Sequence, residues 1–509
     1  MANDKLIVNN TIALYVRSFL SLIIALYTSR LILAYLGVEN YGVYNAVGGI
    51  VSVFAFVQSS LANVTQRYLA YYIGKGDKKE LNRMFNMCLN VHILLSLVLI
   101  IFLEPIGSWY IHNKLDYGVV SDSDVAIIFH TSVASLFFLI VSIPYNSLIL
   151  SNESMKLYAY VDVFSKVLKL LLALSLQYIE SNYRLSIFAI TILIINIIVF
   201  LVYYILCNKK YQESHFLWFW DSKIFKELST FTGYVTLPAF ISIFKTQGML
   251  VVLNQTFGPV FNAAQSVSNQ INNAVKSLAN NVGAAFTPQI TISYAQSQIS
   301  AMTKLFISGS KITFFLFLYM MIPLCIDMDY VLSVWLVEVP EYTKMIAILV
   351  LVDTLITSMT SCYNSAIRAT GQIKWYEIVY NLFHFCGLLL IIYIVYTGCE
   401  YYVPYLILIV FSSLGIFIQI FFVKRVLPTV KLTEMLNSLV RMVLVSICVV
   451  AIALFTHGLW EETSFLVFLI DVLISTASIS LLVLAFGFDK DEKSRLLTMV
   501  KDKFLRKRQ

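Results

Sequence analysis

The sequence YNSLI at residues 145–149 recurs as YNSAI at residues 363–367, about 220 residues later, and a repeat of this kind constrains the fold more than any other local feature. The match continues at the same offset, because Lys156 and Tyr158 are answered by Lys374 and Tyr376. A period of this length is far too long for a solenoid unit. It indicates two homologous halves of one membrane protein, a common way of building transporters.

The composition is that of a protein that lies largely inside a lipid bilayer. The chain has 509 residues, of which 59% are hydrophobic and only 13% charged, and its mean hydropathy is +0.79. These values lie outside the range of soluble globular domains. The seven cysteines form no Cys-x-x-Cys pair, so they are interpreted as small buried apolar side chains.

The apolar stretches predict an all-α polytopic membrane protein. About fourteen of them are long enough to cross the hydrocarbon layer, each needing about 20 residues. Most of the 36 Lys and Arg residues fall on the side that also holds the N-terminus, which places both termini in the cytoplasm. Six spans separate the two copies of the repeat. Because an even number preserves direction, the halves are predicted to be parallel repeats related by an axis along the membrane normal.

This topology predicts two six-helix lobes followed by a C-terminal helix pair. A second match supports it, since Tyr41-Gly42 is repeated as Phe257-Gly258. The expected division is an N-lobe at 1–208, a cytoplasmic interfacial linker at 209–228, a C-lobe at 229–425, the last two spans at 426–489, and a basic cytoplasmic tail at 490–509. The tail is expected to face anionic phospholipid, and a nucleic-acid-binding arm is the alternative that its position disfavours.

Charges inside membrane spans are costly and mark sites or pathways by default. Eight cations fall within the predicted spans: Arg17, Arg30, Arg67, Lys166, Lys169, Lys245, Lys276 and Lys311. Four acids accompany them: Asp162, Asp353, Glu377 and Asp471. The predicted interior is therefore net cationic.

Some of these cations have structural explanations. Asp162 precedes Lys166 by four residues, a favourable pair on one helix face that leaves Lys169 over. Arg67 and Lys311 lie near cytoplasmic span ends, where snorkelling to the interface is the favoured interpretation and a ligand role the alternative. The remaining candidates, Arg17, Arg30, Lys245 and Lys276, are expected to line a hydrated cavity. The alternative for these four is a structural pair with Asp353 or Asp471.

Amide side chains form a second candidate feature. In the predicted eighth span they follow one helix face: Asn262, Gln265, Asn269, Asn273 and Asn280, with Lys276 among them. Such a face can hold helices together in lipid, or it can line a water-filled lumen where amides meet sugar hydroxyls. We predict that Asn269 and Asn273 bind substrate together with Arg17, Arg30, Lys169, Lys245 and Lys276.

A cationic, amide-lined interior suits an anionic and hydroxylated cargo, because Arg and Lys pair with phosphate through charge-assisted hydrogen bonds. The sequence contains no phosphate-binding Gly-rich loop, no nucleophile–base set and no clustered metal ligands, so neither an enzyme nor a cofactor is expected. Transport would then depend on gradients or on the membrane potential. Asp353, about midway through the tenth span, is the candidate for coupling to protons or sodium, and a buried ion pair is its alternative.

Three local motifs resemble those of bacterial polysaccharide and O-antigen flippases: the run Thr28-Ser29-Arg30, the run Leu36-Gly37-Val38 to Tyr44, and the exit from the second span at 66–77. These flippases belong to the multidrug/oligosaccharidyl-lipid/polysaccharide exporter superfamily. The resemblance implies alternating access that moves an undecaprenyl-pyrophosphate-linked oligosaccharide, the repeat unit of O-antigen, capsule or exopolysaccharide, from the cytoplasmic to the periplasmic leaflet. It implies a bacterial inner-membrane location and a substrate-holding role for Arg30.

Three rival functions are weighed against this one. A multidrug or cation antiporter on the same fold would favour acidic lumen residues, and a membrane polysaccharide polymerase or ligase would need a large periplasmic loop. A structural membrane scaffold would not need so many intramembrane cations. The expected partners are the lipid-linked oligosaccharide and membrane phospholipid, with other polysaccharide-assembly proteins as further candidates. No nucleic-acid partner is expected.

Overall fold

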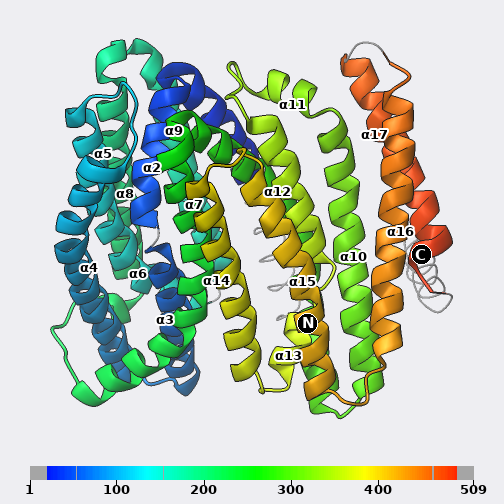
Figure 1. The fold of residues 1–509 in the computed structure, drawn as a ribbon. Coiled ribbons are helices and arrows are strands. Elements are labelled where there is room, and N and C mark those ends of the chain that lie inside the picture. The colour runs from blue at the N-terminus through cyan, green and yellow to red at the C-terminus, as the bar shows by residue number, and fades with distance from the viewer. Residues whose placement is uncertain (1–19, 53, 153, 461–463, 490–509) are drawn as a thin grey trace, which may run out of the picture. The chain divides into compact units, whose positions relative to one another are not determined.

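The computed structural model describes residues 20–52, 54–152, 154–460 and 464–489, and the described part is helical with no strand (Figure 1). Inside the helices, the side chains at 50, 52, 55–57, 59, 60, 63, 227–247, 277–285 and 288 are not among those described. The chain forms two compact units. Unit 1 comprises Met1–Ser266, Trp335–Glu341 and Ile392–Gly398; unit 2 comprises Val267–Val334, Tyr342–Ile391 and Cys399–Gln509.

The helices of the first half begin with Leu20–Leu36, and the chain then bends by 116° at Gly37, whose φ of +82° is a conformation that glycine adopts readily. The following helices are α2 (Val38–Ser52), α3 (Ala55–Lys75), α4 (Lys78–Lys114), α5 (Asp122–Val141), α6 (Ile143–Ser151), α7 (Met155–Ser175) and α8 (Arg184–Lys210). Short 3-10 turns lie at Leu176–Tyr178, Ser181–Tyr183 and Gln212–Ser214.

The second half begins within α9 (Ser222–Ala295), which is interrupted at Gly258 (φ 76°, ψ −175°) just before Pro259. The helices that follow are α10 (Ile299–Ile326), α11 (Met328–Trp335), α12 (Thr343–Ser358), α13 (Tyr363–Ala369), α14 (Lys374–Thr397), α15 (Val403–Val426), α16 (Leu432–His457) and α17 (Phe465–Leu482), with a π-turn at Val483–Gly487.

The membrane character predicted from composition is confirmed. Eight of the described helices are long and apolar enough to span a bilayer, and the number rises to ten if each of two bent pairs is one span. The total of fourteen spans stays a prediction. Many large apolar side chains on these helices are exposed, as expected for surfaces that face lipid.

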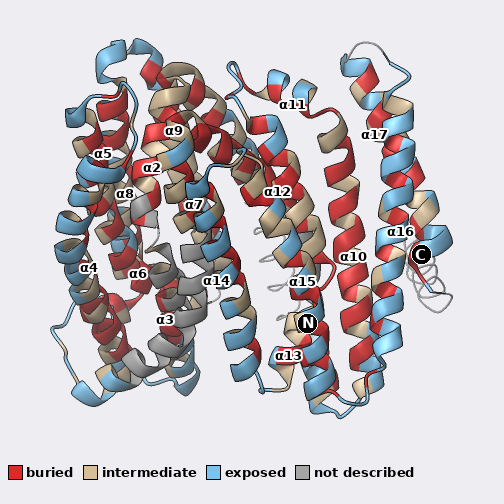
Figure 2. Ribbon diagram, in the orientation of Figure 1, coloured by how far each residue is buried: buried red, intermediate tan, exposed pale blue. Residues whose placement is uncertain are grey.

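In unit 2, α10 is the central helix and packs against α12, α13, α16 and α17 (Figures 1 and 2). In its most apolar window 61% of the residues are buried, compared with 22% in α16 and 28% in α17. The C-terminal helix pair therefore presents most of its surface outward. The prediction that the Lys311 ammonium of α10 snorkels to the interface is wrong. Its side chain is only 2% exposed, and it pairs with Asp489 at 3.5 Å.

The two copies of the repeat occupy equivalent packing environments. Each Tyr-Asn-Ser sits on a short helix after a break, α6 in unit 1 and α13 in unit 2. Tyr145 meets Phe85 edge to face at 5.2 Å, and Tyr363 meets Phe306 in the same geometry at 5.0 Å. Both tyrosines are buried. The repeated tyrosine thus packs against a phenylalanine in the same way in each copy.

Candidate functional site

The first part of the candidate site lies in unit 1, where helix Leu20–Leu36 runs parallel to α7. Two contacts fix their register: Ser21 Oγ donates to Asp162 Oδ2 at 3.1 Å, and Tyr35 OH donates to Gln177 Oε1 at 3.2 Å. Arg30 lies nine residues beyond the first contact and Lys169 seven residues beyond it. At 1.5 Å per residue, these two cations differ in height by only about 3 Å.

The α7 face that carries Lys169 is the face that meets helix Leu20–Leu36. Asp162, Lys166 and Lys169 follow the i, i+4, i+7 spacing of a single helix face, and Asp162 is the residue that accepts from Ser21. The predicted ion pair is present, with Lys166 Nζ 2.9 Å from Asp162 Oδ2. Among the described residues, the half-buried Lys169 ammonium makes no hydrogen bond or ion pair.

A pocket of about 230 Å³ lies elsewhere in unit 1, among α2, α3, α5 and α8. Its lining combines apolar side chains with a set of hydroxyls and amides: Gln58, Thr131, Ser132, Ser135 and Asn196. Such groups can exchange hydrogen bonds with a hydroxylated ligand. Neither Arg30 nor Lys169 lines this pocket.

In unit 2, the second part of α9 separates a packed face from an open one. Ser268, Asn272 and Val275 are buried, and Ser268 Oγ donates to the carbonyl of Thr343 at the start of α12 at 3.3 Å. The predicted binding residues Asn269, Asn273 and Lys276 each follow one of these positions by a single residue. They are therefore rotated by about 100° from the packed face. Asn273 is exposed, and Asn269 and Lys276 are half-buried.

The predicted ion-coupling acid has a local partner. Asp353 of α12 accepts a hydrogen bond from Ser412 Oγ of α15 at 2.5 Å. Gln419 lies on α15 as well, two helical turns further along, and is buried, with no described residue bonded to its side-chain oxygen. The alternative was an ion pair between Asp353 and an intramembrane cation, and no such pair is present among the described residues.

Two of the seven predicted substrate-binding residues cannot be placed. Arg17 lies outside the described residues, and Lys245 belongs to α9 but its side chain is not described. The structure thus brings Arg30 and Lys169 to one level of unit 1, and Asn269, Asn273 and Lys276 to one face in unit 2. Their binding role stays a prediction.

One polar arrangement escaped the sequence analysis entirely. Three asparagines repeat every four residues along α4: Asn82, Asn86 and Asn90. Their side chains form hydrogen bonds with the backbone of the connection that precedes α9. Their side-chain amides donate to the carbonyls of Glu213, His215 and Phe219 at 2.8–3.1 Å, and Asn86 Oδ1 accepts from the Leu217 amide at 2.8 Å. We refer to these three residues as the asparagine ladder. The i, i+4, i+8 spacing was the available signal.

The ladder holds an aromatic segment in an exposed position. Trp218 is 74% exposed, and Phe216 and Trp220 are exposed as well. Aromatic side chains of this kind favour the bilayer interface. The interfacial location of the connection stays a prediction.

A second group of hydrogen bonds, also not predicted from the sequence, joins segments from both sequence halves inside unit 1. Asn254 and Asp116 exchange two hydrogen bonds of 3.1 Å, from the Asp116 amide to Asn254 Oδ1 and from Asn254 Nδ2 to the Asp116 carbonyl. Gln255 accepts from Tyr396 OH at 2.5 Å and donates to Tyr110 OH at 3.0 Å. We call these five residues the outer latch, since the predicted topology places all of them at external span ends.

The backbone is also closely packed beside the latch. Gly42 of α2 lies against the peptide of Pro259, and a Cβ atom at Gly42 would lie 2.0 Å from the Pro259 carbonyl oxygen. Only glycine fits this approach. The contact joins the segment 41–42 to the residue that follows its repeat at 257–258.

Comparison with known proteins gives a fold. No protein-family model matches the chain, and no curated protein matches it. Among solved structures, that of the lipid II flippase MurJ in an inward closed conformation matches with a TM-score of 0.68 and 15% identity, covering 94% of this chain and 98% of that one. The chain shares the fold of this membrane protein.

Two further solved structures carry the same fold with lower scores. An outward-facing multidrug resistance MATE family transporter of the MOP superfamily has a TM-score of 0.56 at 15% identity, covering 83% of this chain and 95% of its own. The MATE multidrug transporter DinF-BH has a TM-score of 0.58 at 16% identity, with the same two coverages. The all-helical membrane fold predicted above is confirmed. The narrower assignment to O-antigen flippases belongs to the proposal that follows.

Proposed function

We propose that this chain is a flippase that moves an undecaprenyl-pyrophosphate-linked oligosaccharide from the cytoplasmic to the periplasmic leaflet of a bacterial inner membrane, by alternating access and with both termini in the cytoplasm. The observation that carries the proposal is the pair of intramembrane cations Arg30 and Lys169 at one level of unit 1, in a fold shared with a lipid II flippase. A pyrophosphate is the group that such cations bind best. O-antigen, capsule and exopolysaccharide repeat units all carry it.

The amide and hydroxyl groups support a sugar-bearing cargo. The open face of α9 offers Asn269 and Asn273 beside Lys276. Amides both donate and accept, which suits the hydroxyls of an oligosaccharide. Lys276 would then act on the anionic part of the cargo.

Energy would come from an ion gradient or from the membrane potential, with Asp353 as the ion-coupling residue. Its short hydrogen bond with Ser412 keeps one carboxylate oxygen oriented. If Asp353 carries the coupling ion, Asp353→Asn removes the dependence of transport on that ion's gradient. Unchanged gradient dependence in this variant would exclude Asp353 from coupling.

The main test is reconstitution in liposomes with a fluorescent lipid-linked oligosaccharide, whose arrival in the opposite leaflet is read by access of a glycan-cleaving enzyme. We expect Arg30→Ala and Lys276→Ala to slow movement by about 10- to 100-fold, the equivalent of one lost hydrogen bond to a charged group. Lys114→Ala is the matched control, because Lys114 is an exposed cation at the end of α4. Undiminished movement in both cavity variants contradicts the mechanism.

A multidrug or cation antiporter is the second candidate, because MATE transporters share the fold. The same liposomes loaded with a cationic dye distinguish the two functions. Dye extrusion without movement of the lipid-linked oligosaccharide would replace the proposal. Movement of neither substrate under any gradient or potential would reject both transport functions.

A further inference from the structure

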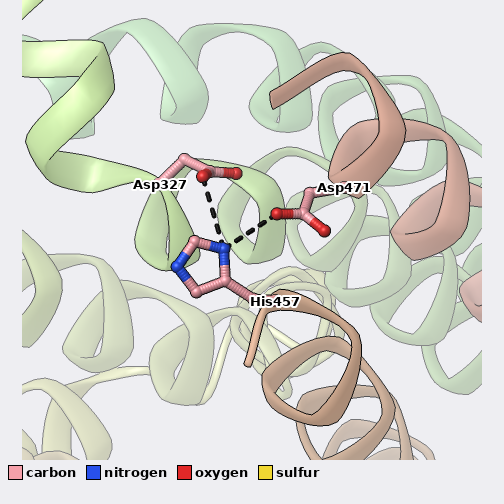
Figure 3. A group of neighbouring side chains, drawn as sticks. All are labelled: Asp327, His457 and Asp471. Atoms are coloured by element: carbon pink, nitrogen blue, oxygen red, sulfur yellow. Dashed lines mark hydrogen bonds and ion pairs between the residues drawn. The ribbon is translucent and has the colours of Figure 1, made fainter. Parts of the chain in front are cut away.

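Three polar side chains that lie far apart in the sequence meet in unit 2. Asp327 follows the last residue of α10, His457 ends α16, and Asp471 lies in the second turn of α17. Figure 3 shows both carboxylates directed at the same imidazole nitrogen. His457 Nδ1 is 2.8 Å from Asp471 Oδ2 and 3.5 Å from Asp327 Oδ1. No local motif marks this group, because 144 positions separate its first and last members.

The cluster is buried and short of hydrogen-bond donors. The side chains of Asp327 and Asp471 are 0% and 1% exposed. Among the described residues, nothing donates a hydrogen bond to either oxygen of Asp327 or to Oδ1 of Asp471. Unpaired buried carboxylates carry a desolvation penalty of several kcal/mol, so a structure retains them when something neutralises them.

A proton shared within the group does not meet this need. Nδ1 of His457 has one N–H at most, and both carboxylates face that single atom. With the imidazole protonated, two carboxylates and one cation still leave one net negative charge. A divalent cation would supply charge and coordination to all three residues together.

The spacing of the ligand atoms matches a small transition-metal ion. One candidate atom from each residue lies within 4.8 Å of the others. In a tetrahedral site with bonds of about 2.0–2.2 Å, ligand atoms are about 3.3–3.6 Å apart. The 3.5 Å separation of His457 Nδ1 and Asp327 Oδ1 already fits, and the 2.8 Å separation from Asp471 needs to lengthen by only about 0.5 Å.

The ligand types select the class of metal. Calcium and magnesium take oxygen ligands almost exclusively, whereas an imidazole with two carboxylates is typical of zinc and its first-row neighbours. The His457 side chain is 28% exposed, so the ion has a route of entry on that side. The last turn of α16 adds the partial negative charge of a helix C-terminus, which favours a cation there.

We propose that Asp327, His457 and Asp471 form a divalent transition-metal site, of the zinc class, that fastens the helix pair α16–α17 to the end of α10. The residues come one from each of the three helices, so the ion joins all three. Besides the Tyr319–Ser480 hydrogen bond and the Lys311–Asp489 pair, the outward-facing α16 and α17 are held by apolar packing, which in lipid lacks the driving force that it has in water. The site is separate from the predicted transport residues and does not depend on the proposed function.

The test uses the full chain, purified in detergent with a tag free of histidine and stripped with a chelator. Bound metal is measured by mass spectrometry after incubation with zinc, and affinity by competition with a chromogenic zinc chelator. We expect about one equivalent of zinc, a rise in the thermal midpoint on adding it, and no comparable effect of calcium or magnesium. Asp327→Asn and Asp471→Asn are expected to weaken binding by at least about 100-fold, since even outer-shell partners of metal ligands contribute about 10- to 100-fold.

Asp329→Asn is the matched control, because Asp329 is two residues from Asp327 but is exposed and pairs with Lys344. It should bind zinc as the native chain does. If either buried variant fails to fold, His457→Gln provides the test at the partly exposed ligand. The proposal is overturned if the native chain retains no stoichiometric zinc, if Asp327→Asn binds as tightly as Asp329→Asn, or if calcium binds as well as zinc.

Discussion

Gly42 offers a direct test of whether the outer latch opens during transport. In Gly42→Ala the new Cβ would lie 2.0 Å from the Pro259 carbonyl oxygen, whereas such contacts are essentially never shorter than 3.0 Å. The backbones must therefore separate by about 1 Å. The obstacle is a backbone atom, so no side-chain rotation relieves it. Overpacking of this kind costs about 1–3 kcal/mol.

That cost acts only on conformations in which α2 and the Pro259 peptide touch. If transport alternates between such a state and one in which they separate, the equilibrium shifts toward the separated state by about 5- to 150-fold. The size of the shift is independent of the cargo. It can therefore be measured on the protein alone.

The assay is a distance measurement between spin labels at Val119 and Val337, both well exposed at 88% and 62%. The seven native cysteines are replaced first. We expect Gly42→Ala to move population from a short to a long distance. Gly48→Ala is the matched control on the same helix, since a Cβ there meets nothing within 4 Å. Identical distance distributions in the two variants would refute the reasoning that this contact closes the external side.

Three further predictions concern stability, each measured as thermal unfolding in detergent. Asn86→Ala removes the acceptor of the Leu217 amide and should destabilise the fold by about 1–3 kcal/mol. Asn113→Ala, at an exposed position on the same helix, should have little effect. Equal losses of stability in the two variants would show that the asparagine ladder does not stabilise the fold. Tyr363→Phe should be neutral or stabilising, because the buried hydroxyl has no partner in the described part of the chain, while Tyr363→Ala should cost about 3–5 kcal/mol; a clear loss in Tyr363→Phe would contradict this. Asp77→Ala should cost about 1 kcal/mol by uncapping α4, and Asp77→Asn should restore most of it; failure of Asn to restore it would point to charge instead of capping.

The features that could be predicted from sequence are those with local causes. The repeated Tyr-Asn-Ser predicted two equivalent helix ends, and both copies pack against a phenylalanine of a neighbouring helix. The amide face of α9 followed from helical periodicity alone. Likewise, the pair of Asp162 and Lys166 needed only the geometry of one helix. In each case the pattern lies within a short stretch or at a fixed helical spacing.

The missed features depend on distant partners. The asparagine ladder binds backbone groups, which have no sequence signature of their own. The carboxylates at Asp327 and Asp471 meet only because three helices end at one place. Lys311 was misjudged for the same reason, since its partner Asp489 lies beyond α17 and nothing near α10 reveals it. Long-range packing decides such contacts, and the linear pattern does not contain it.

The contact of Gly42 with Pro259 has an evolutionary consequence. Residues on the rotation axis of an internal repeat lie next to their own counterparts. Here Gly42 touches the peptide of Pro259, which follows the equivalent glycine Gly258. In an ancestral dimer of identical subunits, both positions would have shared one residue and one backbone conformation. A single chain is free of that constraint. Here Gly42 is helical, whereas Gly258 has a φ of +76° and is followed by Pro259, an asymmetry that two identical subunits could not encode.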